Sequence, residues 1–478
     1  MKRTLTALIG ALLLGPFVVT AQDGHYWTQQ YGTKSMLLSG SVIGGVEDLG
    51  AVYYNPARLA VIENPAFLLS ASVYEMSKIE ASDIFGNSKG ASKAEFKGVP
   101  TLAAGTFKVK FLPKHHFAYA IMTRQQSDVS TSYKNEVYQD VFSTLPGDEY
   151  FSGEMSITNK ANEQWFGLTW SHTLSSKMSV GVTTNYVTNT QTKGSAIELH
   201  ALSSSNEVAI YQYDRNYTYQ ENGLLWKAGL SGNFGKWNLG LTIKTPLLSF
   251  SGSGSYNYEE YLSTIPGLGP QPEVYKTSSQ EGIAMKTKSP WAIGLGATRA
   301  LGRNKIHFST EWYSAIPKYT VMQATRHFSQ STPTDTLDFL LTDQMKSVWN
   351  AGIGMEFFIS EHISGFASFS TDFTTVTDDI TRFLQRQDEA SNSSWKADFY
   401  HWGGGVVLDF KGADITLGVT HTGAQQTIPR LLNFPDGGGG GIFDPNSTAD
   451  LKWDRWRFVF SFSFPFLADY AKKLEGGK

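Results

Sequence analysis

Hydrophobic and polar residues alternate along most of the chain, from Phe67 to the C-terminal region. The clearest stretch carries an aromatic residue at every second position: Trp456, Phe458, Phe460, Phe462, Phe464 and Phe466. Successive side chains of a β-strand point to opposite faces of its sheet, so a period of two predicts strands with one apolar face. Runs of about 9 to 11 residues with this pattern are typical of strands that cross a membrane at a tilt.

Applied to the whole chain, this pattern predicts fourteen strands. Their approximate limits are 67–82, 93–111, 115–133, 152–173, 177–192, 216–234, 236–248, 282–300, 304–316, 344–360, 363–378, 396–410, 413–424 and 452–466. An even number of strands is usual in bacterial outer-membrane barrels. We therefore expect an all-β fold, a transmembrane antiparallel β-barrel of about fourteen strands that occupies residues 67–466.

The connections between the expected strands alternate in length. Short turns, such as 174–176 and 301–303, all fall on one side, whereas the other side has the long segments 193–215, 249–281 and 317–343. Outer-membrane barrels have short periplasmic turns and long external loops. A soluble β-sandwich also has alternating strands, but it has no reason to gather its long loops at one end.

The two ends of the chain differ from the barrel pattern. Residues 1–21 have a basic start, an apolar stretch and a small residue before Gln22, as in a cleaved signal peptide. Residues 467–478 follow the last expected strand and are interpreted as a periplasmic tail. No apolar stretch of 18 or more residues follows the signal, so a helical membrane span is not expected. Together these features predict export to the bacterial outer membrane.

Residues 22–66 lack the alternation, yet they are too rich in apolar residues for a solvated tail. A barrel of fourteen strands has a lumen that strand side chains alone do not fill. We therefore predict that residues 22–66 fold into an N-terminal plug, or hatch, inside the barrel. The small residues Gly44 and Gly45 would let the backbone of this plug approach another backbone closely.

The segment 39–60 resembles the hatch signature of the FadL family of outer-membrane transporters for long-chain fatty acids and other hydrophobic compounds. The family pattern is a small-residue run, an acidic pair, an aromatic residue and Asn-Pro-Ala just before the first strand. The matching residues here are Gly44, Gly45, Glu47, Asp48, Tyr54, Asn55, Pro56 and Ala57. Asn-Pro alone is only a turn signal, so the match depends on the whole segment and on its place before the expected barrel.

The resemblance implies a monomeric barrel, inserted by the barrel assembly machinery, surrounded by outer-membrane lipid and closed by the hatch. It also implies passive uptake of a fatty acid or hydrophobic small molecule through a lumenal pocket, with release through a lateral opening at a kinked strand. The position of that kink does not follow from the sequence. A structural or host-contact barrel that acts like an adhesin, without transport, is the alternative.

Composition narrows the possible chemistry. The 478 residues include no cysteine, which excludes disulfides, thiol nucleophiles and cysteine-bound metals. The net charge is −3 and only 17% of the residues are charged, so nothing indicates a nucleic-acid partner. No phosphate-binding glycine motif is present, and passive diffusion needs no nucleotide or other cofactor.

Three basic residues have the parity of lumen-facing positions: Lys227, Lys244 and Arg457. Burying an unpaired carboxylate is costly, so one such cation could bind the carboxylate of an amphipathic acid. Pairing with lumenal acids such as Glu311 or Glu356 is an equally good interpretation. They are the candidate anion partners of the predicted channel.

No enzymatic or metal site is predicted. Ser309, His307 and Glu311 share one face of a strand and would make a hydrolase site only in a suitable geometry. The adjacent His115 and His116 have no third ligand at a useful spacing. The carboxylates of Asp372, Asp378 and Asp379 could bind a cation, although a solvated loop explains them as well.

Overall fold

The computed structural model describes residues 24–62, 67–69, 73–84, 90–99, 101–107, 109, 111–112, 114–142, 145–264, 273–377, 388–393, 396–410, 413–430, 433 and 447–463. The predicted signal peptide at 1–21, the expected first mature residue Gln22 and the predicted tail at 467–478 lie outside these residues. The described part begins with a segment that contains short helices, residues 24–62, which we call the N-terminal segment.

The N-terminal segment holds the helices α2 (Lys34–Leu37), α3 (Ala51–Tyr54) and η1 (Pro56–Ala60). The other described elements are strands. They are β1 (Phe67–Leu69), β2 (Val73–Ser82), β3 (Ala91–Val99), β4 (Leu102–Phe107), β5 (His115–Gln139), β6 (Glu149–Ser175), β7 (Met178–Leu202), β8 (Val208–Phe234), β9 (Trp237–Lys244), β10 (Leu248–Ser263), β11 (Val274–Ala284), β12 (Ala292–Leu301), β13 (Asn304–Tyr313), β14 (Ile316–Gln323), β15 (His327–Phe328), β16 (Thr336–Leu337), β17 (Leu340–Met345), β18 (Val348–Ser360), β19 (Ile363–Asp372), β20 (Glu389–Ser391), β21 (Phe399–Phe410), β22 (Ala413–Pro429) and β23 (Thr448–Ser463).

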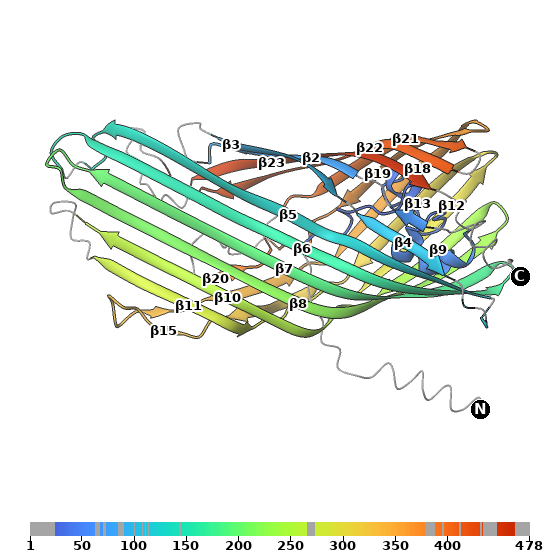
Figure 1. The fold of residues 1–478 in the computed structure, drawn as a ribbon, viewed down its shortest axis with the longest axis horizontal. Coiled ribbons are helices and arrows are strands. Elements are labelled where there is room, and N and C mark those ends of the chain that lie inside the picture. Colours follow the sequence, from blue (N-terminus) through green and yellow to red (C-terminus); the bar gives the residue numbers. More distant parts are fainter. Residues whose placement is uncertain are drawn as a thin grey trace, which may run out of the picture.

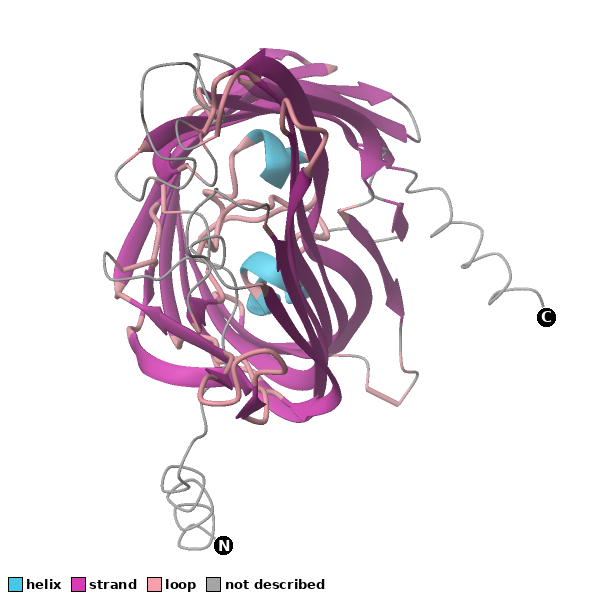
Figure 2. Cartoon of the chain, turned by 90° about the vertical axis from the view of Figure 1, so that its left-hand side faces the viewer, coloured by secondary structure: helices cyan, strands magenta, loops and turns pink. Residues whose placement is uncertain are grey.

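One antiparallel sheet of 18 strands forms the wall. Four pairs of consecutive segments (β1 and β2, β3 and β4, β9 and β10, β11 and β12) lie end to end as interrupted strands, which leaves fourteen strands around the wall. β23 pairs with β2, and β1, which precedes β2 in the chain, pairs with β4. The predicted antiparallel barrel of about fourteen strands is confirmed (Figure 1, Figure 2).

The two faces of the wall carry different side chains. Near the short turns, outward positions are apolar and exposed, for example Leu168, Ile243, Leu295 and Phe308. Inward positions on the same strands are small or polar and buried. Among the described residues no helix has the length and apolar character needed to cross a membrane. Figure 2 shows the short helices inside the ring of strands.

Three segments expected as long loops contain strands instead. β7 and β8 run through most of 193–215, 249–281 contains β10 and most of β11, and β14 to β17 lie largely within 317–343. Figure 1 shows the long strands β5 to β8 extending far to the left of the short-turn end. In these segments the apolar side chains, such as Ile197, Leu199 and Tyr213, point inward and are buried, while most outward positions are polar. The prediction limited each strand to about the length that crosses a membrane and assigned the long segments between them to loops, so it missed strands that continue beyond that length.

Strands β14, β17 and β20 form a separate three-stranded sheet, which we call the lumenal sheet. β14 and β17 are antiparallel, and β17 and β20 are parallel. The buried side chains of the lumenal sheet pack on inward residues of β8 and β10, including Tyr217 and Tyr256. The barrel therefore holds two internal structures, the N-terminal segment and the lumenal sheet.

Candidate functional site in the barrel lumen

Asp48 organises the N-terminal segment. One carboxylate oxygen accepts hydrogen bonds from the backbone N–H groups of Thr33 and Ser35, at 2.9 Å each, and the other accepts from the backbone N–H of Gly50 and the hydroxyl of Ser35, at 2.9 and 2.8 Å. A carboxylate with several such donors is strongly stabilised. Asp48 thus fixes the chain before α2 against the turn that leads into α3.

Asn55, Pro56 and Ala57 join the segment to the wall. The Asn55 side-chain oxygen accepts from the Ala57 N–H at 3.1 Å and caps η1, whose first residue is Pro56. The Asn55 amide group donates to the carbonyl of Ile43 at 2.9 Å and to the carbonyl of Leu230 in β8 at 3.2 Å. One side chain therefore begins a helix, closes the segment on itself and contacts the barrel.

Glycines of the wall allow the close approach. A Cβ on Gly181 would lie 2.5 Å from the carbonyl carbon of Pro56, and a Cβ on Gly240 would lie 2.1 Å from the Ile43 oxygen. Likewise, a Cβ on either Gly44 or Gly296 would collide with the backbone of the other residue. Gly181 pairs with Gly229, and Gly240 with Gly296, so neighbouring strands carry these glycines at a common level. We call this set the glycine belt: Gly181, Gly229, Gly240 and Gly296.

Charged residues also connect the segment to the wall near the short turns. Glu47 accepts from the Lys305 ammonium of β13 at 2.8 Å, and Lys305 lies 3.3 Å from Glu356 of β18. Gly45 sits against Thr298, where a Cβ would meet the threonine hydroxyl at 2.3 Å. Arg58 donates to the carbonyl of Val46 at 3.2 Å; burial lowers the pKa of Arg58, and the charge of Glu47 opposes that shift.

Tyr54 belongs to the interior of the segment. Its hydroxyl accepts from the backbone N–H of Tyr31 at 3.0 Å, and burial holds the pKa of Tyr54 well above its ordinary value. Its ring packs against Gly40, because a Cβ on Gly40 would lie 2.9 Å from the ring. Tyr54 therefore stays a neutral packing residue, and no contact with the barrel wall is needed to explain its position.

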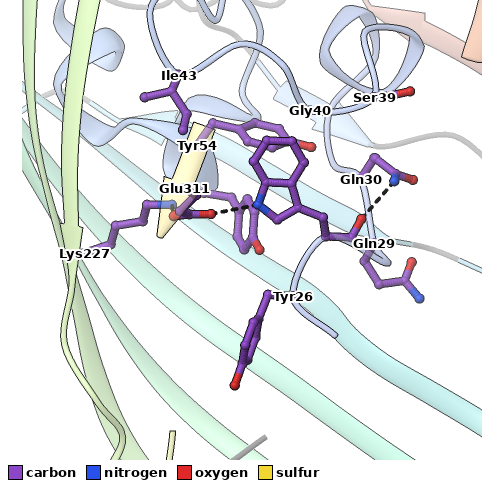
Figure 3. Close-up of a pocket in the computed structure, with 11 residues that line it drawn as sticks. Tyr26, Gln29, Gln30, Ser39, Gly40, Ile43, Tyr54, Lys227 and Glu311 are labelled. Carbon is purple, nitrogen blue, oxygen red and sulfur yellow. Dashed lines mark hydrogen bonds and ion pairs between the residues drawn. The ribbon is translucent and has the colours of Figure 1, made fainter. Parts of the chain in front are cut away.

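A small cavity lies where the N-terminal segment meets β8 and β13 (Figure 3). Its volume is about 10 Å³, which is roughly what one water molecule needs. Lys227 and Glu311 point toward each other at its edge, with Nζ and Oε1 3.2 Å apart (Figure 3). The Trp27 indole donates to the other Glu311 oxygen at 3.0 Å, and the Tyr313 hydroxyl also donates to it. In this conformation the cavity is too small for a ligand.

Lys244, the second sequence candidate, is also buried, but its surroundings are aromatic. Its ammonium lies 5.6 Å from the Tyr26 ring centre and 5.9 Å from the Tyr313 ring centre, within cation–π range. Among the described residues, no carboxylate lies within ion-pair distance of Lys244. Lys227, by contrast, has Glu311 as its partner.

Arg457, the third candidate, forms an ion pair and binds the N-terminal segment. Its Nε donates to Glu75 of β2 at 2.9 Å, and its terminal nitrogens donate to the side-chain oxygens of Gln29 and Gln30. The guanidinium is 1% exposed, so it is fully occupied by protein groups. Lys227 and Lys244 are thus neighbours, paired across β8 and β9, whereas Arg457 lies apart from them on β23.

The residues considered for hydrolysis do not form a catalytic arrangement. Ser309 accepts from the backbone N–H of Ile43, His307 shares a hydrogen bond with Thr298, and Glu311 binds Trp27 and Lys227. None of the hydrogen bonds of the described residues joins any two of the three. Each instead supports the wall or its contact with the N-terminal segment.

The residues considered as metal ligands are also engaged elsewhere. His115 accepts from the Trp170 indole at 2.8 Å and stacks on His172. Asp378 and Asp379 lie outside the described residues, so they cannot be placed beside Asp372. In the described part of the chain, no group of three or more histidine and acidic residues is arranged to hold a metal ion.

Asp372 contributes to the lumen in a way that the sequence did not suggest. Its carboxylate accepts from the Tyr26 backbone N–H at 2.9 Å and from the Thr28 hydroxyl at 2.7 Å. It lies 3.7 Å from His401 and is fully buried. A single acid at the end of an expected strand gives no signal of such a contact, because its partners are more than 340 residues away in the chain.

Comparisons with known proteins give a match at the level of structure. No protein-family model and no curated protein sequence matches the chain. A FadL homologue of Pseudomonas aeruginosa aligns over 92% of this chain and 100% of its own, with 11% identity and a TM-score of 0.51. The chain has the FadL fold.

Two toluene transporters align over a similar share of the chain. TodX of P. putida covers 91% of this chain and 98% of its own, at 11% identity and a TM-score of 0.49. TbuX of Ralstonia pickettii covers the same shares at 10% identity and a TM-score of 0.45. The alignment with the FadL homologue covers 92% of this chain, so the predicted resemblance to that family is confirmed for the architecture. At such low identity the ligand must be argued from the lumen itself.

Proposed function

We propose that the protein is an outer-membrane channel for the passive uptake of hydrophobic compounds. The FadL fold, the apolar outer face near the short turns and the filled lumen support this proposal. The long-loop end then faces the outside, and the short turns face the periplasm, as in other barrels of the outer membrane. The N-terminal segment acts as the hatch, which seals the barrel until a ligand displaces it.

Long-chain fatty acids are the leading substrate class, and Lys244 is the observation that carries this assignment. A buried ammonium held by two tyrosine rings can bind the carboxylate of an amphipathic acid, while aromatic surfaces receive the chain. Lys227 is less suited to this role because Glu311 already neutralises it. The cavity beside them holds about one water molecule, so the present conformation is closed.

Lateral release into the membrane is the second part of the proposal. The interruption between β3 and β4 is its support. Pro100 follows β3 and has no N–H for a ladder. The pairing of β4 with β5 ends at Leu102 and Met122, and just beyond it the Thr123 N–H donates to the Thr101 carbonyl. β3 is paired with β2.

Exposed apolar side chains lie next to this interruption. Tyr74 and Met76 of β2 and Phe96 of β3 are 44%, 43% and 68% exposed, although they sit on directly paired strands. Such a surface suits contact with lipid or with an apolar ligand leaving the barrel. We propose that the kinked strand expected from the family is the one formed by β3 and β4.

Uptake by cells tests the function. The protein is expressed in a bacterial host without a long-chain fatty acid channel, and entry of radiolabelled oleate and toluene is measured. Lys244→Met should lower oleate entry by about tenfold, because a charge-assisted hydrogen bond is worth about 1.5 to 3 kcal/mol. Toluene entry should stay unchanged, since toluene carries no charge.

The exposed Lys160, which pairs with Asp128 on the outside of the wall, supplies the matched control. Lys160→Met should leave the entry of both compounds as in the wild type. Equal loss of oleate and toluene entry in Lys244→Met would contradict the assigned role of Lys244. If the wild type takes up neither compound, the structural or host-contact barrel is the correct interpretation, and adhesion of expressing cells to host surfaces should then be measured.

A further inference from the structure

The lumenal sheet covers the route from the outside to the cavity. This is evident along β8, where Val208 marks the outer end and Gly235 follows the strand at the inner turn. The lumenal sheet contacts β8 at Tyr217 and Tyr219, whereas Lys227 and Gly229 lie further in. A ligand that enters from the long-loop end therefore meets the lumenal sheet before it meets Lys227, Lys244 or the N-terminal segment.

Side-chain contacts hold this sheet against the wall. The Phe339 ring, just before β17, stacks on Tyr256 of β10 with ring centres 4.1 Å apart. Asn392, just after β20, donates to the Tyr219 hydroxyl at 3.1 Å and accepts from the Tyr217 hydroxyl at 3.2 Å. These contacts are buried, and they link loop residues to side chains of β8 and β10 rather than to continuous strand ladders.

The Lys193 ammonium also donates to the Asn392 carbonyl, and the Lys288 N–H donates to the Tyr319 hydroxyl of β14 at 3.0 Å. Among the described residues, one short backbone pairing joins the sheet to the wall. Met322 of β14 pairs with Met285, which follows β11, and the Lys286 N–H donates to the Val321 carbonyl at 2.9 Å. Gly254 of β10 makes room for Met322, because a Cβ there would lie 2.3 Å from the methionine sulfur. The sheet is thus fitted to the wall but joined to it by little backbone pairing.

The sheet also contacts the N-terminal segment directly. The Tyr26 hydroxyl donates to the Met345 sulfur of β17 at 3.1 Å. Thr375 accepts from the Lys346 N–H at 2.7 Å and donates to the Gly24 carbonyl at 2.9 Å. Because the Tyr26 ring also faces Lys244, movement of β17 would reach the proposed carboxylate site and the start of the hatch together.

We propose that the lumenal sheet is a second, external gate, which leaves the inner face of β8 and β10 before a ligand reaches Lys244. The inference rests on the proposed channel function. The gate is closed in this conformation by Asn392 and Phe339. Its opening is passed to the start of the hatch, at Gly24 and Tyr26, through Thr375 and Met345.

A disulfide that ties the gate to the wall tests this proposal, and the absence of native cysteine keeps the chemistry simple. Met285→Cys combined with Met322→Cys places two thiols at a directly paired antiparallel position, where the Cα separation suits a disulfide. In the cell assay, the oxidised double variant should lose uptake of radiolabelled oleate, and dithiothreitol should restore it. The neighbouring pair Lys286→Cys with Val321→Cys should behave in the same way, and it replaces the first pair if that double variant does not fold.

The matched control places the disulfide within the gate. Thr320→Cys with Thr342→Cys joins β14 to β17 at a paired position without touching the wall, so uptake should stay at the wild-type rate when oxidised. Wild-type uptake by the oxidised wall-to-gate variants would overturn the gate while leaving the channel intact. Absence of uptake by the wild type would instead overturn the channel and, with it, the gate.

Discussion

The N-terminal segment and the lumenal sheet both fill the barrel, but they are held in different ways. The N-terminal segment meets the glycine belt backbone to backbone, and Asn55 and Asp48 hold its own turns in place. The lumenal sheet rests on aromatic side chains, chiefly Tyr256, and on the hydrogen bonds of Asn392. The first contact requires a fixed fit, whereas the second can be broken by moving a few side chains.

This difference indicates which of the two internal structures leaves the barrel wall more easily. Close-packed backbone contacts leave no room for adjustment, so small additions of volume are costly. Hydrogen bonds between neutral groups contribute only about 1 kcal/mol each, and they can re-form with water when exposed. We therefore expect the lumenal sheet to open at lower free energy than the N-terminal segment.

The largest effect is expected at the glycine belt. Gly240→Ala places a methyl group 2.1 Å from the Ile43 carbonyl oxygen and 2.8 Å from the Asn55 amide nitrogen. Overpacking against backbone costs about 3 kcal/mol, which corresponds to roughly hundredfold faster amide exchange in residues 43–57. Hydrogen–deuterium exchange of the detergent-solubilised protein measures this.

Gly98 provides the control for that substitution, because a Cβ built there meets nothing within 4 Å. Gly98→Ala should leave exchange in residues 43–57 at the wild-type rate. Exchange in the lumenal sheet should change little in either variant if the two structures are held independently at the wall. Unaltered exchange in Gly240→Ala would show that the belt does not hold the N-terminal segment.

An intermediate effect is expected at Asp48. Asp48→Ala removes the acceptor for the N–H groups of Thr33, Ser35 and Gly50. We expect a loss of about 2 kcal/mol of local stability, since several donors lose a charged partner in a partly buried place. Limited proteolysis of residues 24–62 should become faster.

Glu47 is the matched comparison because it is the adjacent acid. Its ion pair with Lys305 is partly exposed, and such pairs contribute about 0 to 1 kcal/mol. Glu47→Gln should therefore alter proteolysis little. If Glu47→Gln accelerates cleavage as much as Asp48→Ala does, the segment is held by its charge contact with the wall and not by its internal turns.

The same contrast explains what the sequence could predict. The barrel class follows from a repeated local pattern, and the resemblance of 39–60 to a hatch signature rests on adjacent residues whose contacts, such as those of Asp48, are local. The limits of the plug at 22 and 66 and the roles of Lys227, Lys244 and Arg457 stay predictions. The alternation of side chains along a strand indicates which face of the sheet each of these basic residues occupies, but not which group it contacts.

The lumenal sheet lay beyond prediction for a physical reason. Its strands are short, β20 has three residues, and β17 pairs with it across more than 40 residues of chain. Asn392 resembles any loop asparagine in sequence, and only the register of β8 brings Tyr217 and Tyr219 to it. Propensity and periodicity describe single elements, so such distant pairings leave no trace in them.

The smallest effect is expected at the lumenal sheet. Asn392→Ala removes the side-chain hydrogen bonds to Tyr217 and Tyr219 but keeps the backbone bond from its N–H to Thr342, so the sheet itself should stay folded. We expect a loss of about 1 kcal/mol, or roughly fivefold faster amide exchange in residues 340–345, with exchange in residues 43–57 unchanged. The control is Ser329→Ala, which alters a buried hydroxyl beside the hairpin of β15 and β16 outside the lumenal sheet. An acceleration of exchange greater than that caused by Gly240→Ala, or equal exchange in Asn392→Ala and the wild type, would mean that the two internal structures are not held as differently as their contacts indicate.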